Sequence, residues 1–88
     1  MLNPEYTSTF KKDLSKLQRR NKDITKLITV ISMLINEVPL PAKFEDHPLK
    51  GNYADHRDCH IEPDWILIYK VGKAHIEFVR TGSHSDLF

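Results

Sequence analysis

Hydrophobic residues in the first 36 positions recur at helical spacing. Phe10, Leu14 and Leu17 lie three or four residues apart, and Thr7 or Ser8 precedes them as a candidate N-cap. After a break at residues 21–23, a second set follows the i, i+3, i+4, i+7 pattern: Ile24, Leu27, Ile28, Ile31, Leu34 and Ile35. Because the break is so short, the pattern predicts a helical hairpin.

From residue 57 the hydrophobic period changes to two, which is typical of strands. Segments 57–62, 65–71 and 74–81 are predicted strands, separated by turns at residues 63–64 and 72–73. In the second strand, Trp65, Leu67 and Tyr69 share one face. Residues 39–56 between the two halves begin with prolines that end the helical pattern, and they are expected to form an ordered loop.

Helices followed by hairpin-connected strands indicate an α+β fold. We expect the N-terminal helical hairpin to pack on one face of a small antiparallel sheet. Residues 1–6 are a further candidate strand, which Pro4 would confine to a sheet edge. Without repeats, linkers or low-complexity tracts, residues 1–88 are expected to be a single domain.

Composition narrows the setting in which the protein works. Cys59 is the only cysteine, so no disulfide forms within the chain, and a lone thiol suits a reducing compartment. The N-terminus lacks a signal-peptide pattern. The most apolar stretch, residues 24–38, is too short and too polar to cross a bilayer. A cytoplasmic protein without a membrane partner is expected.

Charge is distributed unevenly although the net charge is only +1. Residues 1–36 carry seven Lys or Arg against three acids, whereas residues 37–88 carry six against nine. Such asymmetry favours a nucleic-acid contact on the basic side. A solvated helix face would produce the same charges.

All five histidines lie between residues 47 and 84. His60 and Asp64 flank the first strand turn and are expected to project toward one end of the sheet. Arg80 has the strand parity of the apolar face unless the strand bulges there, and an unpaired guanidinium is costly to bury. His84 follows the last strand, and His47 lies in the loop.

These residue types fit two chemistries. In metal-free RNA cleavage, histidines act as acid and base because their pKa values lie near neutrality, and arginine stabilises the phosphorane. Alternatively, His47, His60, Asp64 and His84 supply nitrogen and oxygen ligands to a metal, although no zinc-hydrolase motif is present. Taken singly, each histidine also fits a structural or surface position, and we place His56 and His75 in that class.

Three segments of the chain resemble the YafQ branch of the RelE/ParE superfamily of bacterial toxins. They are Phe44–Gly51 (FEDHPLKG), Arg57–Lys70 (RDCHIEPDWILIYK) and Arg80–Phe88 (RTGSHSDLF). Toxins of this branch belong to type II toxin–antitoxin pairs, enter the ribosomal A site and cut messenger RNA there without a metal or another cofactor. The resemblance therefore implies a RelE-like fold and a ribosome-dependent endoribonuclease that inhibits translation.

Carried over position by position, the resemblance implies an active site. Its expected members are His47, His60, Asp64 and His84 for proton transfer and orientation, Arg80 for the scissile phosphate, and Trp65 and Phe88 for shaping the site or contacting bases.

The same resemblance implies a role for the basic helical residues 1–36. A ribosome-dependent enzyme must dock on ribosomal RNA, and phosphate contacts position it without reading sequence. The candidates are Lys11, Lys12, Lys16, Arg19, Arg20, Lys22 and Lys26. The expected partners are the ribosome, messenger RNA and a cognate antitoxin, which alone would contact operator DNA.

Three other functions compete with this interpretation. A gyrase poison of the ParE type would not need three histidines with Asp64 and Arg80. A non-catalytic partner of a repressor would use the same fold only for binding. A metal-dependent hydrolase would use the histidines as ligands.

Overall fold

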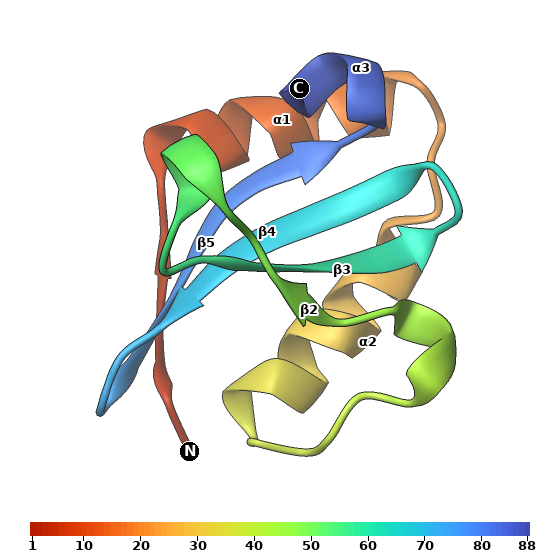
Figure 1. Ribbon diagram of the computed structural model, residues 1–88. Helices are drawn as coiled ribbons and strands as arrows, with labels where there is room; N and C mark the ends of the chain where they lie inside the picture. The colour runs from red at the N-terminus through yellow and green to blue at the C-terminus, as the bar shows by residue number, and fades with distance from the viewer.

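The computed structural model describes residues 1–88 and shows two long helices packed beside a sheet (Figure 1). A five-stranded sheet has the order β1-β5-β4-β3-β2. The elements in chain order are β1 (Asn3–Tyr6), α1 (Ser8–Arg19), α2 (Ile24–Ile35), the 3₁₀ helix η1 (Ala42–Phe44), β2 (His47–Pro48), the 3₁₀ helix η2 (Gly51–Tyr53), β3 (Arg57–Glu62), β4 (Trp65–Val71), β5 (His75–Gly82) and α3 (His84–Leu87).

Side-chain caps fix where the two long helices begin. The Thr7 hydroxyl accepts a hydrogen bond from the backbone N–H of Phe10, and Asp23 accepts one from Thr25. Asn21 adopts a left-handed φ of 59°, which turns the chain between the helices. Thr7, rather than Ser8, is therefore the first cap, and the predicted break at 21–23 is confirmed.

The sheet is mixed, so the prediction of an antiparallel sheet is wrong for one strand. β3, β4 and β5 pair antiparallel as expected, but β1 runs parallel to β5, from Asn3 beside His75 to Tyr6 beside Phe78. A parallel pair needs a long crossover, and the rest of the chain provides it. The edge position expected for the strand containing Pro4 is confirmed.

Both helices cover one face of the sheet, as predicted. Trp65 and Tyr69 lie there at 2 % exposure or less, against Phe10 and Leu17 of α1 and Leu27 of α2. Alternate residues of β4 face the other way, where they form a smaller apolar cluster. Its buried members are Ile66, Ile68 and Leu87 of α3. Only α3 and nearby loop residues cover this second face, and the candidate site described below lies on it.

A bulge in β5 sends Arg80 to this second face. Ile68 pairs with Arg80 and Tyr69 pairs with Phe78, so β5 has one extra residue, Val79, between them. Phe78 and Thr81 consequently both face the helices. Arg80 therefore does not lie on the Phe78 face, and the bulge for which the sequence prediction allowed is present.

Several short elements were absent from the sequence prediction. The segment expected to be a loop contains β2 and both 3₁₀ helices, and α3 follows the last strand. Elements of two to four residues contain at most about one period, so no hydrophobic repeat can reveal them. No helix is long and apolar enough to span a membrane.

Candidate active site

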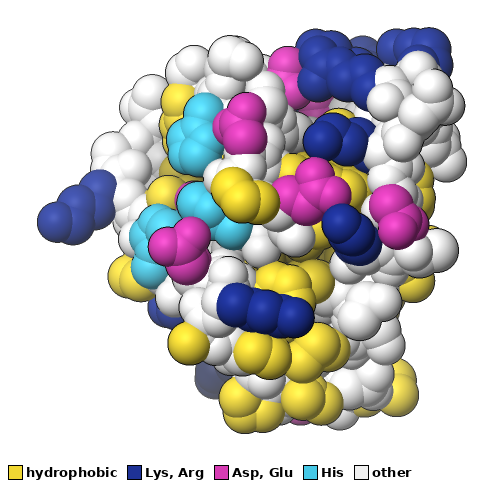
Figure 2. Space-filling model, turned by 90° about the vertical axis from the view of Figure 1, so that its right-hand side faces the viewer, with side chains coloured by type: hydrophobic (Ala, Val, Ile, Leu, Met, Phe, Trp, Pro, Cys, Tyr) yellow, Lys and Arg dark blue, Asp and Glu magenta, His cyan; other side chains and the backbone are white.

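Three of the five histidines form a row on the partly covered face (Figure 2). His47 comes from β2, His60 from β3 and His84 from the start of α3. The ring centroids of His47 and His60 are 6.2 Å apart, and those of His60 and His84 are 5.8 Å apart. The fold thus brings together three predicted histidines that are separated by 37 positions along the chain.

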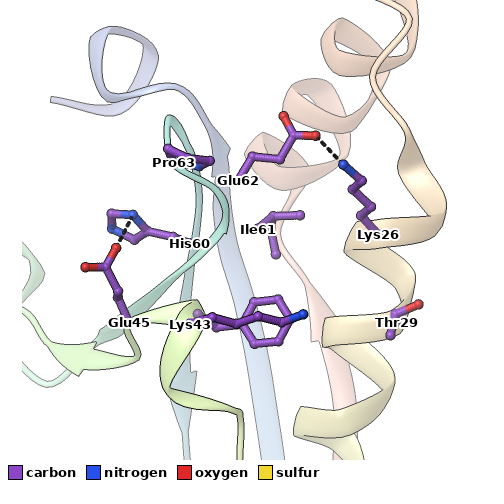
Figure 3. Close-up of a pocket in the computed structure, with 9 residues that line it drawn as sticks. Lys26, Thr29, Lys43, Glu45, His60, Ile61, Glu62 and Pro63 are labelled. Carbon is purple, nitrogen blue, oxygen red and sulfur yellow. Dashed lines mark hydrogen bonds and ion pairs between the residues drawn. The ribbon is translucent and has the colours of Figure 1, made fainter.

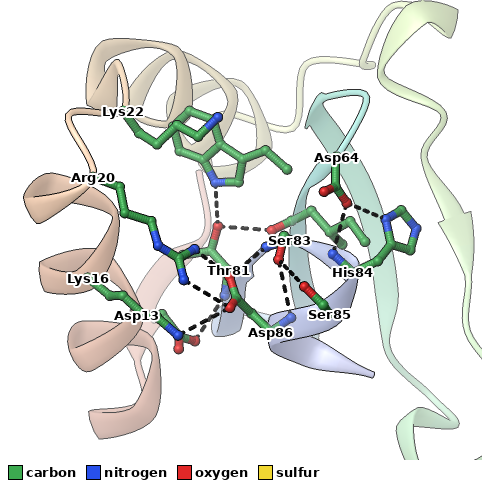
Figure 4. A network of polar contacts seen from close by, with 12 residues as sticks. Asp13, Lys16, Arg20, Lys22, Asp64, Thr81, Ser83, His84, Ser85 and Asp86 are labelled. Carbon is green, nitrogen blue, oxygen red and sulfur yellow. Dashed lines mark hydrogen bonds and ion pairs between the residues drawn. The ribbon is translucent and has the colours of Figure 1, made fainter.

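His84 is held by Asp64, which lies in the turn between β3 and β4 (Figure 4). One carboxylate oxygen, Oδ1, accepts from the His84 backbone N–H at 3.0 Å and lies 2.8 Å from Nδ1 of the ring. These two hydrogen bonds hold the pKa of Asp64 below its usual range. With Nδ1 directed at an acceptor, Nε2 is the ring nitrogen left to exchange a proton with a ligand.

Asp58 is a member of the site that the sequence interpretation missed. It neighbours His47 across the β2–β3 pair, is 4 % exposed, and has Oδ1 2.9 Å from His47 Nε2. The approach is short but poorly directed, since Oδ1 receives no hydrogen bond of good geometry. Asp58 precedes His60 by two positions in a strand, so strand parity would have placed it on the same face.

The short approach of His47 Nε2 to Asp58 Oδ1 requires a hydrogen between these two atoms. His47 Nδ1 lies 2.7 Å from the carbonyl of Glu45, which only accepts, so Nδ1 carries a hydrogen. A hydrogen bond between His47 Nε2 and Asp58 therefore requires one more hydrogen, either on Nε2 or on the Asp58 carboxyl group. Burial raises the pKa of Asp58, although the charges of His47 and His60 oppose the shift.

A cavity of about 550 Å³ opens beside His60, between α2 and η1 (Figure 3). His60 Nδ1 lies 3.3 Å from Glu45 and is otherwise unpartnered in the protein. Lys43 and Lys26 also line the cavity, and Lys26 is bound there by Glu62. The middle histidine of the row is thus accessible from this cavity.

Arg80 is oriented by Asp13 of α1. Its Nε and Nη2 atoms donate to the two carboxylate oxygens at 2.8 and 3.1 Å. This forked geometry leaves Nη1 outside the ion pair, on a guanidinium that Tyr53 also approaches, while Asp13 also accepts from the Thr81 backbone. The hydrogen bond to Asp13 raises the pKa of Arg80.

Phe88 lies at the His84 end of the histidine row, between the rings of His84 and Tyr53. Its ring is 6.3 Å from that of His84 and 6.0 Å from that of Tyr53, and it is 64 % exposed. Tyr53, from η2, also lies 5.7 Å from His56. Sequence reasoning missed Tyr53 and set His56 aside. A loop tyrosine has no periodic signal that would have identified it.

Trp65 does not lie on this surface, so its expected contact with a base is corrected. The indole is 1 % exposed on the helix-covered face, where Nε1 donates to the Thr81 hydroxyl at 2.9 Å. Because Trp65 begins β4 beside the turn that holds Asp64, the indole can affect the site only through packing.

Four of the seven cations expected to contact ribosomal RNA are engaged within the protein. Lys16 and Arg20 bind Asp86, and Lys22 and Lys26 bind Glu62. The other three are exposed and have no carboxylate partner: Lys11, Lys12 and Arg19. On the predicted basic surface, four cations are thus in ion pairs with carboxylates and three are not.

The side chains proposed as metal ligands do not converge. No group of three or more His, Cys, Asp or Glu residues is arranged to hold a metal ion. His47, His60 and His84 are instead spaced along a row, each with its own carboxylate: Asp58, Glu45 and Asp64. The arrangement suits separate proton carriers.

Comparison with known proteins finds similar sequences and the same fold in bacterial toxins. The chain is 48% identical over 85 residues to the mRNA interferase toxin YafQ of Escherichia coli K12, covering 96% of this chain and 92% of that protein. YafQ in the E. coli DinJ–YafQ toxin–antitoxin complex superposes with a TM-score of 0.93 at 46% identity, covering 99% and 97% of the two chains. A metal-bound toxin from Helicobacter pylori gives a TM-score of 0.94 at 43% identity, with complete coverage of both chains.

Family assignment follows from the extent of these matches. Residues 2–88 match the family model described as the bacterial toxin of a type II toxin–antitoxin system, YafQ. The fold, the ordered motifs and the relatives agree over nearly the whole chain. The prediction from the three motifs is confirmed, and the chain belongs to the YafQ family of type II toxins.

Proposed function

We propose that this toxin is an mRNA interferase that cuts messenger RNA in the ribosomal A site and so inhibits translation in the cytoplasm. The observation that carries the proposal is the His84–Asp64 pair, which leaves Nε2 open beside His60 and Phe88. The name of the E. coli relative supports the same reaction class.

In the proposed reaction the 2′-hydroxyl of the messenger attacks the adjacent phosphorus. A base takes the hydroxyl proton, the bond to the 5′-oxygen breaks, and an acid gives that oxygen a proton. Nε2 of His84 is one proton carrier, with its tautomer fixed by Asp64. His60, whose ring centroid is 5.8 Å from that of His84, is the second group, and the His47–Asp58 pair lies next to it.

Arg80 and Phe88 bind the messenger in this proposal. The side of the guanidinium that Asp13 leaves free donates to the scissile phosphate, where negative charge grows in the phosphorane. The exposed Phe88 ring stacks on a base. Trp65 holds the site's scaffold from the core side.

A translating extract with a defined messenger tests this function. Cleavage is expected with the wild-type chain, with and without EDTA, and is expected to fall by at least about 100-fold in His84→Ala. His75→Ala is the matched control, because His75 is exposed at the far end of β5 and belongs to no part of the site.

The alternatives give different results in the same experiment. Cleavage that EDTA abolishes would favour a metal-dependent hydrolase. A folded chain that binds its antitoxin but never cuts would be a binding module or co-repressor.

Docking on ribosomal RNA is the proposed role of the basic α1–α2 surface, and the unpaired cations Lys11, Lys12 and Arg19 carry most of it. Cations already held by Asp86 and Glu62 would first have to break ion pairs before neutralising a phosphate.

A matched pair of charge reversals tests the docking surface. Lys11→Glu/Lys12→Glu is expected to weaken ribosome binding and to flatten its salt dependence. Lys70→Glu/Lys73→Glu, at the β4–β5 hairpin, changes the net charge equally and is expected to bind normally. Equal weakening by both pairs would attribute the effect to net charge alone.

A cognate antitoxin is the proposed protein partner, and operator DNA is contacted only through it. The E. coli relative forms such a complex. Binding only to the folded toxin also stabilises it by mass action, which a small core makes useful. Co-expression with the cognate antitoxin should restore growth, and the bound antitoxin should raise the toxin's melting temperature.

A further inference from the structure

The catalytic His84 sits on an element that cannot hold itself in place. α3 has four residues, and so short a helix is unstable without tertiary contacts. Leu87 supplies an apolar anchor at 8 % exposure. The position of His84 therefore depends on what else ties α3 to the body of the protein.

Asp86 provides the strongest of these ties (Figure 4). Arg20 of α1 donates to its two carboxylate oxygens at 2.8 and 3.2 Å, and Lys16 donates at 3.1 Å. The carboxylate is only 14 % exposed although both cations are more than 40 % exposed. These contacts hold the pKa of Asp86 far below its usual range.

The same carboxylate organises the start of α3. Asp86 accepts from the backbone N–H of Ser83, and its own N–H donates to the Ser83 hydroxyl, which completes a capping box. A Cβ at Gly82 would lie 3.0 Å from Asp86 Oδ2, so glycine permits this close approach. Asp86 thus connects α1 to the residue immediately before His84.

We propose that Asp86 is a positioning residue for His84, and that Arg20 and Lys16 act with it as a clamp rather than as ribosomal RNA contacts. The clamp fixes the first turn of α3, so that the backbone and Nδ1 of His84 both reach Asp64. The inference rests on the proposed function for its kinetic effect, and on geometry alone for the orientation of the ring.

Three variants test the clamp: Asp86→Asn, Arg20→Met and the double variant. Asn keeps the size and the acceptor of Asp86 for Ser83 but loses its charge. Both single variants are expected to lower the single-turnover cleavage rate on saturated ribosomes by about 10-fold to 100-fold, since small misplacement of a reacting group is that costly. The double variant is expected to match either single one, and Lys70→Met serves as the unaffected control.

Binding data separate the clamp from RNA docking. If Arg20 contacts RNA, Arg20→Met weakens ribosome binding, whereas Asp86→Asn frees the arginine and strengthens it. If Arg20 belongs to the clamp, both variants change the rate in the same direction and leave half-saturation unchanged. Opposite effects of the two variants would overturn the proposal.

A spectroscopic readout does not depend on cleavage. The nitrogen resonances of the His84 imidazole, followed by NMR in the folded Asp86→Asn chain, are expected to move toward those of Asp64→Asn, while circular dichroism remains native. Unchanged resonances together with an unchanged cleavage rate would overturn the clamp. If His84→Ala still cut messenger, the proposed function would fail, yet the resonances would still test the positioning of the ring.

Discussion

The buried hydrogen bond between Trp65 and Thr81 joins β4, which begins directly after Asp64, to β5, which carries Arg80. Thr81→Val preserves the shape of the side chain but removes the acceptor of the indole N–H and the donor to the Ile66 carbonyl. An unpaired buried polar group costs about 1–3 kcal/mol. We therefore expect unfolding free energy to fall by about 2–3 kcal/mol, and the melting temperature by roughly 10–20 °C for a domain of this size.

Urea denaturation followed by far-UV circular dichroism measures this loss. Circular dichroism is used in place of tryptophan fluorescence because Trp65 is the only tryptophan, and its signal would be absent from Trp65→Phe. Trp65→Phe and Thr81→Val should couple, with the double variant about 1 kcal/mol more stable than the sum of the single effects predicts. Additive effects would show that the hydrogen bond contributes nothing.

Cleavage by Trp65→Phe tests the burial argument. At a temperature where the variant is fully folded, we expect its rate to stay within about threefold of the wild type, because an indole that is 1 % exposed cannot stack on a base. A loss of 100-fold or more in a fully folded variant would refute the reasoning and restore a direct role for the indole.

Three further outcomes are expected. Burial raises the pKa of the Cys59 thiol to about 12, so a thiol reagent should label the chain only at the rate of unfolding, and fast labelling at pH 8 would contradict this. Asp13→Asn should lower the unfolding free energy by about 1–3 kcal/mol and reduce cleavage, since it leaves Arg80 without its orienting partner; an unchanged denaturation midpoint would count against that pairing. The pKa values of Asp86 and Glu62 are lowered in the folded state from usual values of 3.8 and 4.5, so the unfolded chain takes up their protons first. Their contribution is thus present above about pH 5 and lost as the pH falls, and the urea midpoint measured from pH 7 to pH 3 should decline below pH 5.

Much of the fold could be predicted from hydrophobic period alone. The second helix, β3 and β4 begin and end where the pattern changes, because burial on one face imposes a regular spacing. The direction of β1 could not be predicted, since a short edge strand carries no information about its partner. The bulge in β5 could only be raised as a possibility, from the cost of burying Arg80, because one extra residue alters parity without altering composition.

Some residues of the candidate site could be predicted from the sequence, and others could not. His47, His60, Asp64 and His84 were named from motifs, and the structure brings their side chains together. Asp58 could have been predicted, because it lies two positions before His60 in the same strand. Tyr53 could not, because it lies outside any periodic element. Trp65 was assigned to substrate although its alternation with Leu67 and Tyr69 indicated the core. Which lysines and arginines are paired depends on contacts between distant segments, and residue type does not reveal it.

The parallel pairing of β1 with β5 has a consequence for how the protein is made. Synthesis delivers β1, α1 and α2 first, but their sheet partners follow only after residue 56. Joining Asn3 to His75 closes a loop of some 70 residues, which slows folding relative to a helical protein of equal length. The three histidines, which come from β2, β3 and α3, reach their final spacing only after β5 has been translated. A growing chain therefore cannot complete the histidine row before the C-terminal segment with His84 has been made.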